Sequence, residues 1–155
     1  PACGTGNFLY VAMEQLLRLE SKALDFLRQI GRPVPPRVGP HQFLGLELNP
    51  RAAVIAEIVC WIGWLRYRLE ADPTAVPDPV LKQTAAINFG RPGGYDAALA
   101  FNEFGSVDFD NVRQSAWPEA EFIVGNPPFI GAKILRQTLD PGYVEALWKA
   151  NSRVP

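Results

Sequence analysis

Hydrophobic residues recur at helical spacing in the first part of the chain. Apolar side chains lie three, four or seven positions apart between residues 13 and 30, which predicts a helix of about six turns from near Asn7 to Ile30. Asn7 has the side chain of a good N-cap. Gly31 should end the helix, because glycine readily adopts the left-handed conformation of a helix C-terminus and the prolines that follow cannot extend the helix.

A second helix is predicted where Asn49 and Pro50 precede a long apolar run. Asparagine is a favourable N-cap, and proline is favourable at the first helical position because its missing N–H would have no partner there. From Arg51 to Leu69 the sequence is apolar on most sides of the helix. We therefore expect this helix to be largely buried.

Shorter apolar runs elsewhere predict strands. Residues 42–48, 86–89 and 121–125 have the length and apolar character of strands, whereas residues 97–104 and 135–150 have weaker helical patterns. Strands that alternate with helices predict an α/β fold with a mainly parallel sheet. In such a sheet, ligands bind beyond the carboxyl ends of the strands.

Composition narrows the class of protein. With 155 residues, 48% of them hydrophobic, the chain is long enough for one domain with a buried core. Its formal net charge of −1 argues against a free-standing nucleic-acid binder. No uninterrupted apolar run reaches the roughly 18 residues of a membrane span, so we expect no membrane partner. Cys3 and Cys60 cannot form a disulfide framework, which indicates a reducing, cytoplasmic location. His41 has no partners at metal-ligand spacing, so we expect no metal site.

The first seven residues form a candidate ligand-binding loop. The sequence Pro-Ala-Cys-Gly-Thr-Gly-Asn runs directly into the first predicted helix, whose free N–H groups can receive an anionic group. Leu9 occupies the position where a dinucleotide fingerprint needs its third glycine, and no Gly-Lys-Ser/Thr follows. The alternative is a turn that serves only the fold. Because the chain begins inside this loop and without Met, we expect it to be a fragment of a longer polypeptide.

Glu47 lies at the end of the predicted strand 42–48. A carboxylate at the end of the second strand can accept two hydrogen bonds from ribose hydroxyls. The alternative is a solvated carboxylate, or one that caps the helix that follows. Glu47 is therefore a candidate ligand of a nucleoside.

The most specific motif is the turn Asn126-Pro127-Pro128-Phe129, directly after the predicted strand 121–125. Two prolines remove two backbone donors, and a residue before proline is held extended. The Asn126 side-chain oxygen and the Pro127 carbonyl can therefore converge on one donor, while Phe129 offers an apolar face. This arrangement suits an exocyclic amino group on a planar base, whose nitrogen can attack an in-line methyl donor without a strong general base. The alternative is a Pro-Pro turn that follows a strand and has no chemical role.

Taken in order, residues 1–9, 45–48 and 124–129 resemble the amino-group DNA methyltransferases, which are S-adenosylmethionine-dependent N6-adenine enzymes. The cofactor loop precedes the catalytic turn, as in the gamma arrangement. The sequence around the turn is similar to that of methylases in fused restriction–modification and phage-defence systems. The resemblance implies a Rossmann-like class I methyltransferase fold. It also implies that residues 1–155 are a partial catalytic domain without a target-recognition domain, inactive alone.

The resemblance implies catalytic roles for the residues of the turn. Asn126 and Pro127 would hold the N6 amino group of an adenine flipped out of double-stranded DNA. Pro128 would complete the turn, and Phe129 would stack on the flipped base.

The resemblance also implies cofactor contacts. Glu47 would hold the ribose of S-adenosylmethionine. Asp96 would contact the adenine amino group of the cofactor, although an ordinary helix-capping aspartate is the alternative. The methionine end of the cofactor would lie against the loop residues Pro1, Ala2, Cys3, Gly4, Thr5, Gly6 and Asn7.

Other functions stay open at this point. Methylation of an RNA base or of a protein glutamine amide uses similar turns on similar folds. The chain could also be a cofactor-binding remnant without catalysis. A nicotinamide oxidoreductase is disfavoured by Leu9 in the glycine loop and by the Asn-Pro-Pro-Phe turn.

Overall fold

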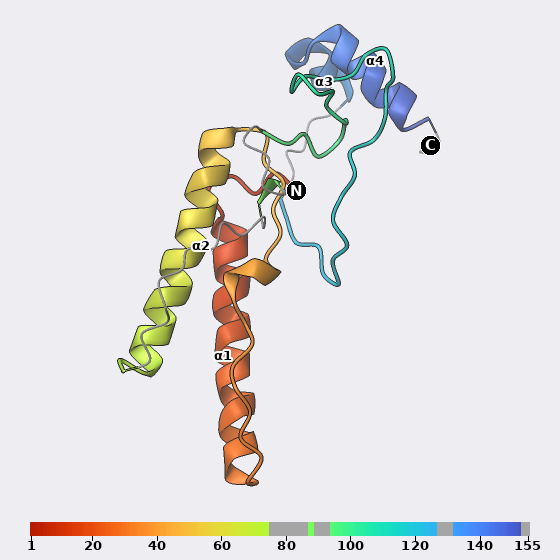
Figure 1. Cartoon of the computed structure of the whole chain (residues 1–155). Helices are drawn as coiled ribbons and strands as arrows, with labels where there is room; N and C mark the ends of the chain where they lie inside the picture. Colours follow the sequence, from red (N-terminus) through yellow and green to blue (C-terminus); the bar gives the residue numbers. More distant parts are fainter. Residues whose placement is uncertain (75–86, 89–93, 127–131, 153–155) are drawn as a thin grey trace.

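The computed structural model describes residues 1–74, 87–88, 94–126 and 132–152. Two long helices, α1 (Asn7–Gln29) and α2 (Pro50–Ala71), lie side by side and are joined by a connector that contains a short 3-10 helix, η1 (Pro40–Gln42) (Figure 1). Two shorter helices, α3 (Ala132–Thr138) and α4 (Pro141–Ala150), pack together near the C-terminus (Figure 1). None of the described helices is long and apolar enough to cross a membrane.

Helix α1 confirms the first helical prediction but begins differently. Its N-cap is Gly6 in the left-handed conformation, with φ of 88°, so Asn7 is the first helical residue and the prediction of an Asn7 cap is wrong. The C-terminus is as expected. Gly31 has φ of 74° and its N–H donates to the Arg28 carbonyl, while Arg32 N–H donates to the Leu27 carbonyl. These two bonds form a Schellman motif.

Helix α2 confirms the predicted cap but not the predicted burial. The Asn49 side chain accepts hydrogen bonds from the N–H groups of Arg51 and Ala52, and Pro50 opens the helix. Only one side of the helix is buried, through Ala53, Ala56 and Cys60. The opposite side leaves apolar residues exposed, namely Val54, Ile55, Ile58, Ile62 and Leu69. Helix α1 and the connector cover a single face of α2, so an all-round apolar sequence is only half covered by the described residues.

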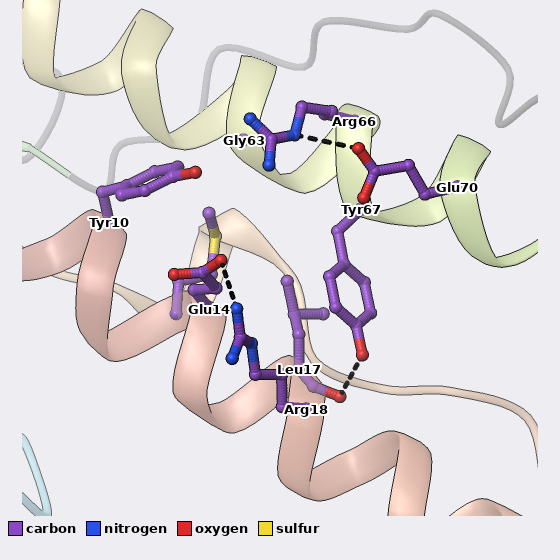
Figure 2. Close-up of a pocket in the computed structure, with 9 residues that line it drawn as sticks. Tyr10, Glu14, Leu17, Arg18, Gly63, Arg66, Tyr67 and Glu70 are labelled. Atoms are coloured by element: carbon purple, nitrogen blue, oxygen red, sulfur yellow. Dashed lines mark hydrogen bonds and ion pairs between the residues drawn. The ribbon is translucent and has the colours of Figure 1, made fainter.

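The main core lies between α1 and α2. Met13 and Leu17 of α1 pack with Cys60 of α2 and with Phe43 of the connector. Figure 2 shows the outer edge of this interface, where the Tyr67 hydroxyl donates to the Leu17 carbonyl at 3.1 Å. The edge is a shallow pocket of about 100 Å³. None of the residues that line it belongs to the site predicted from the sequence, so we assign it to helix packing.

The connector is held against the two helices by side-chain hydrogen bonds. Glu20 accepts from the backbone N–H groups of Arg37 and Val38. The Val38 carbonyl in turn accepts from Trp64 Nε1 at 3.0 Å. Arg68 lies 3.7 Å from Glu20. These bonds satisfy backbone groups in a segment whose prolines leave few regular hydrogen bonds.

The prediction of an α/β fold with a mainly parallel sheet, and of a Rossmann-like arrangement, is wrong for the structure: the described residues contain helices and no strand or sheet. The expected strand 42–48 gives part of η1 and one parallel bridge, between Gly45 and Ile87. Residues 121–125 are exposed and form no strand. A strand requires a partner along several successive residues, and among the described residues the pairing is limited to one bridge.

The region 97–104 is also different from its prediction. It forms no helix but two antiparallel bridges, Leu99 with Gln114 and Phe101 with Val107. By contrast, helix is confirmed within residues 135–150. Asp140 caps α4 by accepting from the Tyr143 N–H, and Pro141 starts the helix. The wrong predictions are therefore the strands 42–48 and 121–125 and the helix 97–104, whereas the two long helices and the helical region 135–150 are confirmed.

Gly6 is expected to be intolerant of any side chain. Its φ of 88° is left-handed, and a Cβ would lie 2.9 Å from the Cβ of Ala56, which is fully buried. We expect Gly6→Ala to destabilise the domain by about 2–4 kcal/mol, from backbone strain plus overpacking. Gly31→Ala is the matched control, because Gly31 has φ of 74° but open space around it, and should cost about 1 kcal/mol. Thermal unfolding of the full-length variants measures both. Equal losses would contradict the packing explanation.

Candidate functional site

The glycine loop is held in a tight turn at the start of α1. Cys3 N–H donates to the Leu46 carbonyl at 3.0 Å, and Gly6 N–H donates to the Cys3 carbonyl at 2.9 Å. Ala2, Gly4 and Gly6 have φ of 50°, 57° and 88°, so three residues of the loop have positive φ. Of the seven loop residues predicted as cofactor contacts, Ala2, Thr5 and Asn7 are exposed, Pro1, Cys3 and Gly4 are half-buried, and Gly6 is buried.

Glu47 joins the glycine loop to the start of α2. Its Oε2 accepts from Gly4 N–H at 2.7 Å, and its Oε1 accepts from Asn49 N–H at 2.9 Å. The sequence suggested a capping carboxylate as the alternative to a ribose ligand, and the bond to Asn49 shows such a contact. The bond to Gly4 was not predicted. An ionised carboxylate has about four acceptor positions, so Glu47 can make these two bonds and still accept from a ligand.

The side chain of Asn88 pairs with the backbone of Glu47. Its Oδ1 accepts from Glu47 N–H and its Nδ2 donates to the Glu47 carbonyl, both at 2.8 Å. The Glu47 carbonyl also accepts from Tyr95 N–H at 2.7 Å. The sequence indicated Asn88 only as part of a strand. An asparagine after an apolar run is one of the few non-glycine residues that tolerate left-handed backbone, which was the available signal.

The start of the Asn-Pro-Pro-Phe turn meets the glycine loop, although the two are far apart in the sequence. A Cβ added to Gly125 would lie 3.2 Å from the Pro1 carbonyl oxygen and 3.3 Å from Pro1 Cδ. The backbone of Gly125 therefore lies against Pro1, and Asn126 follows it with an exposed side chain. The other three residues predicted to be catalytic, Pro127, Pro128 and Phe129, lie outside the described residues.

Asp96 is buried and fully engaged. Its Oδ1 accepts from the N–H groups of Ala98 and Leu99, and its Oδ2 accepts from the Tyr143 hydroxyl at 2.8 Å. Burial and this hydrogen bond raise the pKa of Tyr143 well above its usual range, so the phenol stays a donor. Asp96 also lines an open pocket of about 210 Å³. The structure shows a turn-capping role for Asp96 and a tie to α4 that the sequence did not indicate.

The predicted site is therefore brought together in part. The glycine loop is bonded to the Glu47 carboxylate through Gly4 N–H, and its first residue, Pro1, lies against Gly125, the residue before Asn126. Asp96 is connected through its neighbour Tyr95, which donates to the Glu47 carbonyl. The Glu47 carboxylate and the exposed residue Asn126 are thus both associated with the glycine loop, one by a hydrogen bond and the other through its neighbour Gly125. Such a set can bind a polar ligand with hydroxyl groups beside a second ligand that carries an amino group.

Comparison with known proteins places the chain among the DNA methyltransferases. Residues 1–151 match the family model described as "MmeI, DNA-methyltransferase domain", and the chain belongs to this family. It is 27% identical over 135 residues to "DNA methyltransferase A" of Bacillus subtilis (strain 168). The aligned region covers 86% of this chain and 14% of that relative, so the chain spans a small part of the relative's length. No solved structure matches the chain. The resemblance to the DNA methyltransferases is therefore confirmed as membership of this family.

The two cysteines are expected to be poorly reactive. Burial raises the pKa of the Cys3 thiol, and the Glu47 carboxylate raises it further. Burial also raises the pKa of Cys60, to about 11. Because the thiolate is the reactive form, Cys60 should react with iodoacetamide at pH 7.5 roughly a hundredfold more slowly than an unperturbed cysteine, and labelling should rise with pH. Peptide mapping by mass spectrometry measures both rates.

A paired variant tests the cause assigned to Cys3. Glu47→Gln removes the neighbouring negative charge, so Cys3 labelling should become faster while Cys60 labelling stays unchanged. Rapid labelling of Cys60 in the wild-type protein would contradict the buried position of this thiol.

Proposed function

We propose that this domain transfers a methyl group from S-adenosylmethionine to the N6 amino group of adenine in double-stranded DNA. The observation that supports this proposal best is the contact of Gly125 with Pro1, because Asn126 directly follows Gly125 and Glu47 is bonded to the same loop through Gly4. For direct methyl transfer, the loop that binds the cofactor must lie next to the residue that holds the target amino group. Since the domain belongs to a DNA-methyltransferase family, DNA is the substrate that this arrangement supports best.

The residues present fit S-adenosylmethionine. Glu47 keeps free acceptor positions for ribose hydroxyls after bonding Gly4 and Asn49. The exposed residues Ala2 and Thr5 leave a surface of the loop open for the methionine end. When bound, this cofactor supplies an electrophilic methyl group on a positively charged sulfur. The protein residues then have to orient the ligand and the target base.

Asn126 would act on the target base. Its side-chain oxygen can accept a hydrogen bond from the adenine amino group and hold the nitrogen with its lone pair toward the methyl group. An aromatic amine is a weak nucleophile because its lone pair is delocalised into the ring. Accepting its N–H hydrogens favours a pyramidal nitrogen, and positioning supplies the rate. We extend the proposal to the Pro127 carbonyl as a second acceptor and to Phe129 as a stacking surface.

The target adenine would have to leave the DNA stack. Enzymes that act on a base inside a duplex flip it into a pocket, where aromatic side chains hold its face. The sequence similarity around the turn supports a methylase of a restriction–modification or phage-defence system. In such a system, methylation would mark the host DNA.

Methyl transfer by the full-length protein tests this proposal. The protein is incubated with methyl-labelled S-adenosylmethionine and, in separate reactions, with double-stranded DNA, RNA and protein. The DNA is digested to nucleosides, and the label is identified by mass spectrometry. We expect the label in N6-methyladenine. Label found in RNA or protein alone, or in a methylated cytosine, would overturn the proposal.

A further inference from the structure

Asn88 completes a hydrogen-bond ladder with its side chain rather than with its backbone. Gly45 and Ile87 form a parallel bridge, and Asn88 N–H donates to the Gly45 carbonyl at 2.9 Å. Asn88 then turns into the left-handed region with φ of 54°, so its backbone leaves the ladder. Its side-chain amide instead pairs with both backbone groups of Glu47, each at 2.8 Å.

This pairing holds the backbone of Glu47 in place. Both ends of the Asn88 amide are used, one as acceptor and one as donor, in the pattern that a neighbouring peptide group would give. Asn88 is 1% exposed, so water does not compete for these bonds. The backbone of Glu47 is held in this way. Its carboxylate accepts hydrogen bonds from Gly4 N–H in the glycine loop and from Asn49 N–H at the start of α2.

We infer that Asn88 is a positioning residue for cofactor binding, acting through the backbone of Glu47. The inference rests on the proposed function, since it takes the carboxylate of Glu47 as the ribose acceptor. The two hydrogen bonds to the Glu47 backbone, one accepted and one donated, require an asparagine at this position. Aspartate has no donor for the Glu47 carbonyl when ionised, glycine has no side-chain amide, and glutamine is one methylene too long for a buried position.

Two variants separate the amide from the backbone conformation. Asn88→Gly tolerates φ of 54° without strain, so it removes only the amide. Asn88→Asp keeps the size and one acceptor but turns the donor into an acceptor that faces the Glu47 carbonyl. For both variants at pH 8, we expect the Kd for S-adenosylmethionine to rise by about 10- to 100-fold. The kcat at saturating cofactor and the KM for DNA should change by less than about threefold.

The pH profile gives a readout that a general loss of structure would not. A protonated aspartate carries one O–H donor and one carbonyl acceptor, like asparagine. A buried carboxyl has a raised pKa, so the introduced aspartate should become neutral as the pH falls toward 6. Cofactor binding by Asn88→Asp should therefore recover from pH 8 to pH 6. Asn88→Gly, measured in parallel, should show no recovery, because it has no side chain that can regain the two hydrogen bonds.

Calorimetry on the full-length proteins measures the Kd, and Tyr67→Phe is the matched control. It removes one hydrogen bond, to the Leu17 carbonyl, at the outer edge of the interface between α1 and α2 and away from Glu47. We expect this variant to bind the cofactor like the wild type. Wild-type affinity in a folded Asn88→Gly, or equal pH profiles of the two Asn88 variants, would overturn the inference. If the wild-type protein itself binds no S-adenosylmethionine, the proposed function fails instead.

Discussion

Asn126→Ala is expected to lower methyl transfer to DNA by about 10²- to 10³-fold while the Kd for S-adenosylmethionine stays within about twofold of the wild type. Asn126 is an exposed residue that directly follows Gly125, which lies against Pro1 of the glycine loop. Its proposed task is to accept a hydrogen bond from the target amino group, and alanine has no acceptor. Losing a preorganised group that acts on the reacting atoms lowers kcat rather than cofactor affinity.

Asn111→Ala is a suitable control for this variant, because Asn111 is an exposed asparagine outside the proposed site. It should retain wild-type activity. Single-turnover methylation of DNA by the full-length proteins measures the chemical step, and calorimetry measures cofactor binding. An unchanged single-turnover rate in the Asn126→Ala variant would contradict the proposed catalytic role of Asn126.

Glu47→Ala should have the second large effect, this time on the cofactor. The variant loses the hydrogen bonds to Gly4 and Asn49 as well as the proposed acceptor for ribose. Hydrogen bonds to a charged group contribute about 1.5–3 kcal/mol each, so we expect the Kd for S-adenosylmethionine to rise by at least about 10²-fold. Glu47→Gln keeps one acceptor oxygen, and its Kd should lie between those of the wild type and Glu47→Ala.

Glu14→Ala is the control for the loss of a carboxylate. Glu14 is half-buried at the edge of the helix pair and forms an ion pair with the exposed Arg18, and a pair that is open to solvent contributes little. Its removal should leave the cofactor Kd unchanged. Calorimetric titration compares the three variants with the wild type. A Glu47→Ala protein that binds the cofactor as tightly as Glu14→Ala does would refute the assignment of Glu47.

The helices were predictable because their determinants are local. The cap at Asn49, the proline after it and the glycine at residue 31 each act within one helical turn. Asn7 was misassigned as a cap because Gly6 can take the left-handed conformation there without a side-chain hydrogen bond. The observed helix therefore begins close to the predicted position, although the capping residue was predicted wrongly.

The sheet was not predictable from apolar runs. Residues 42–48 were expected to pair as a strand, but pairing depends on a distant partner, and the structure gives one bridge before Asn88 turns away. The expected burial of α2 failed for a related reason. Apolar residues on all sides of a helix indicate that it has packing partners, but they do not say which segments these are. Within the described part of the chain, α2 is covered on one face.

The sequence could propose residues for a site, but it could not predict how they are connected. Glu47 and the glycine loop were both identified from the sequence, yet the bond between Glu47 and Gly4 joins residues from separate segments. The contact of Gly125 with Pro1 is equally non-local. Tyr143 and Asn88 were missed because each acts through one partner, Asp96 or Glu47, that only the fold brings near.

A crystal structure of the full-length protein with bound S-adenosylhomocysteine tests the proposed methyl-transfer site most directly. This ligand is the cofactor after its methyl group has left. We expect its ribose hydroxyls within hydrogen-bonding distance of the Glu47 carboxylate, its amino-acid end along the loop 1–7, and its sulfur facing Asn126. A ligand bound elsewhere, or one whose sulfur points away from Asn126, would contradict the site.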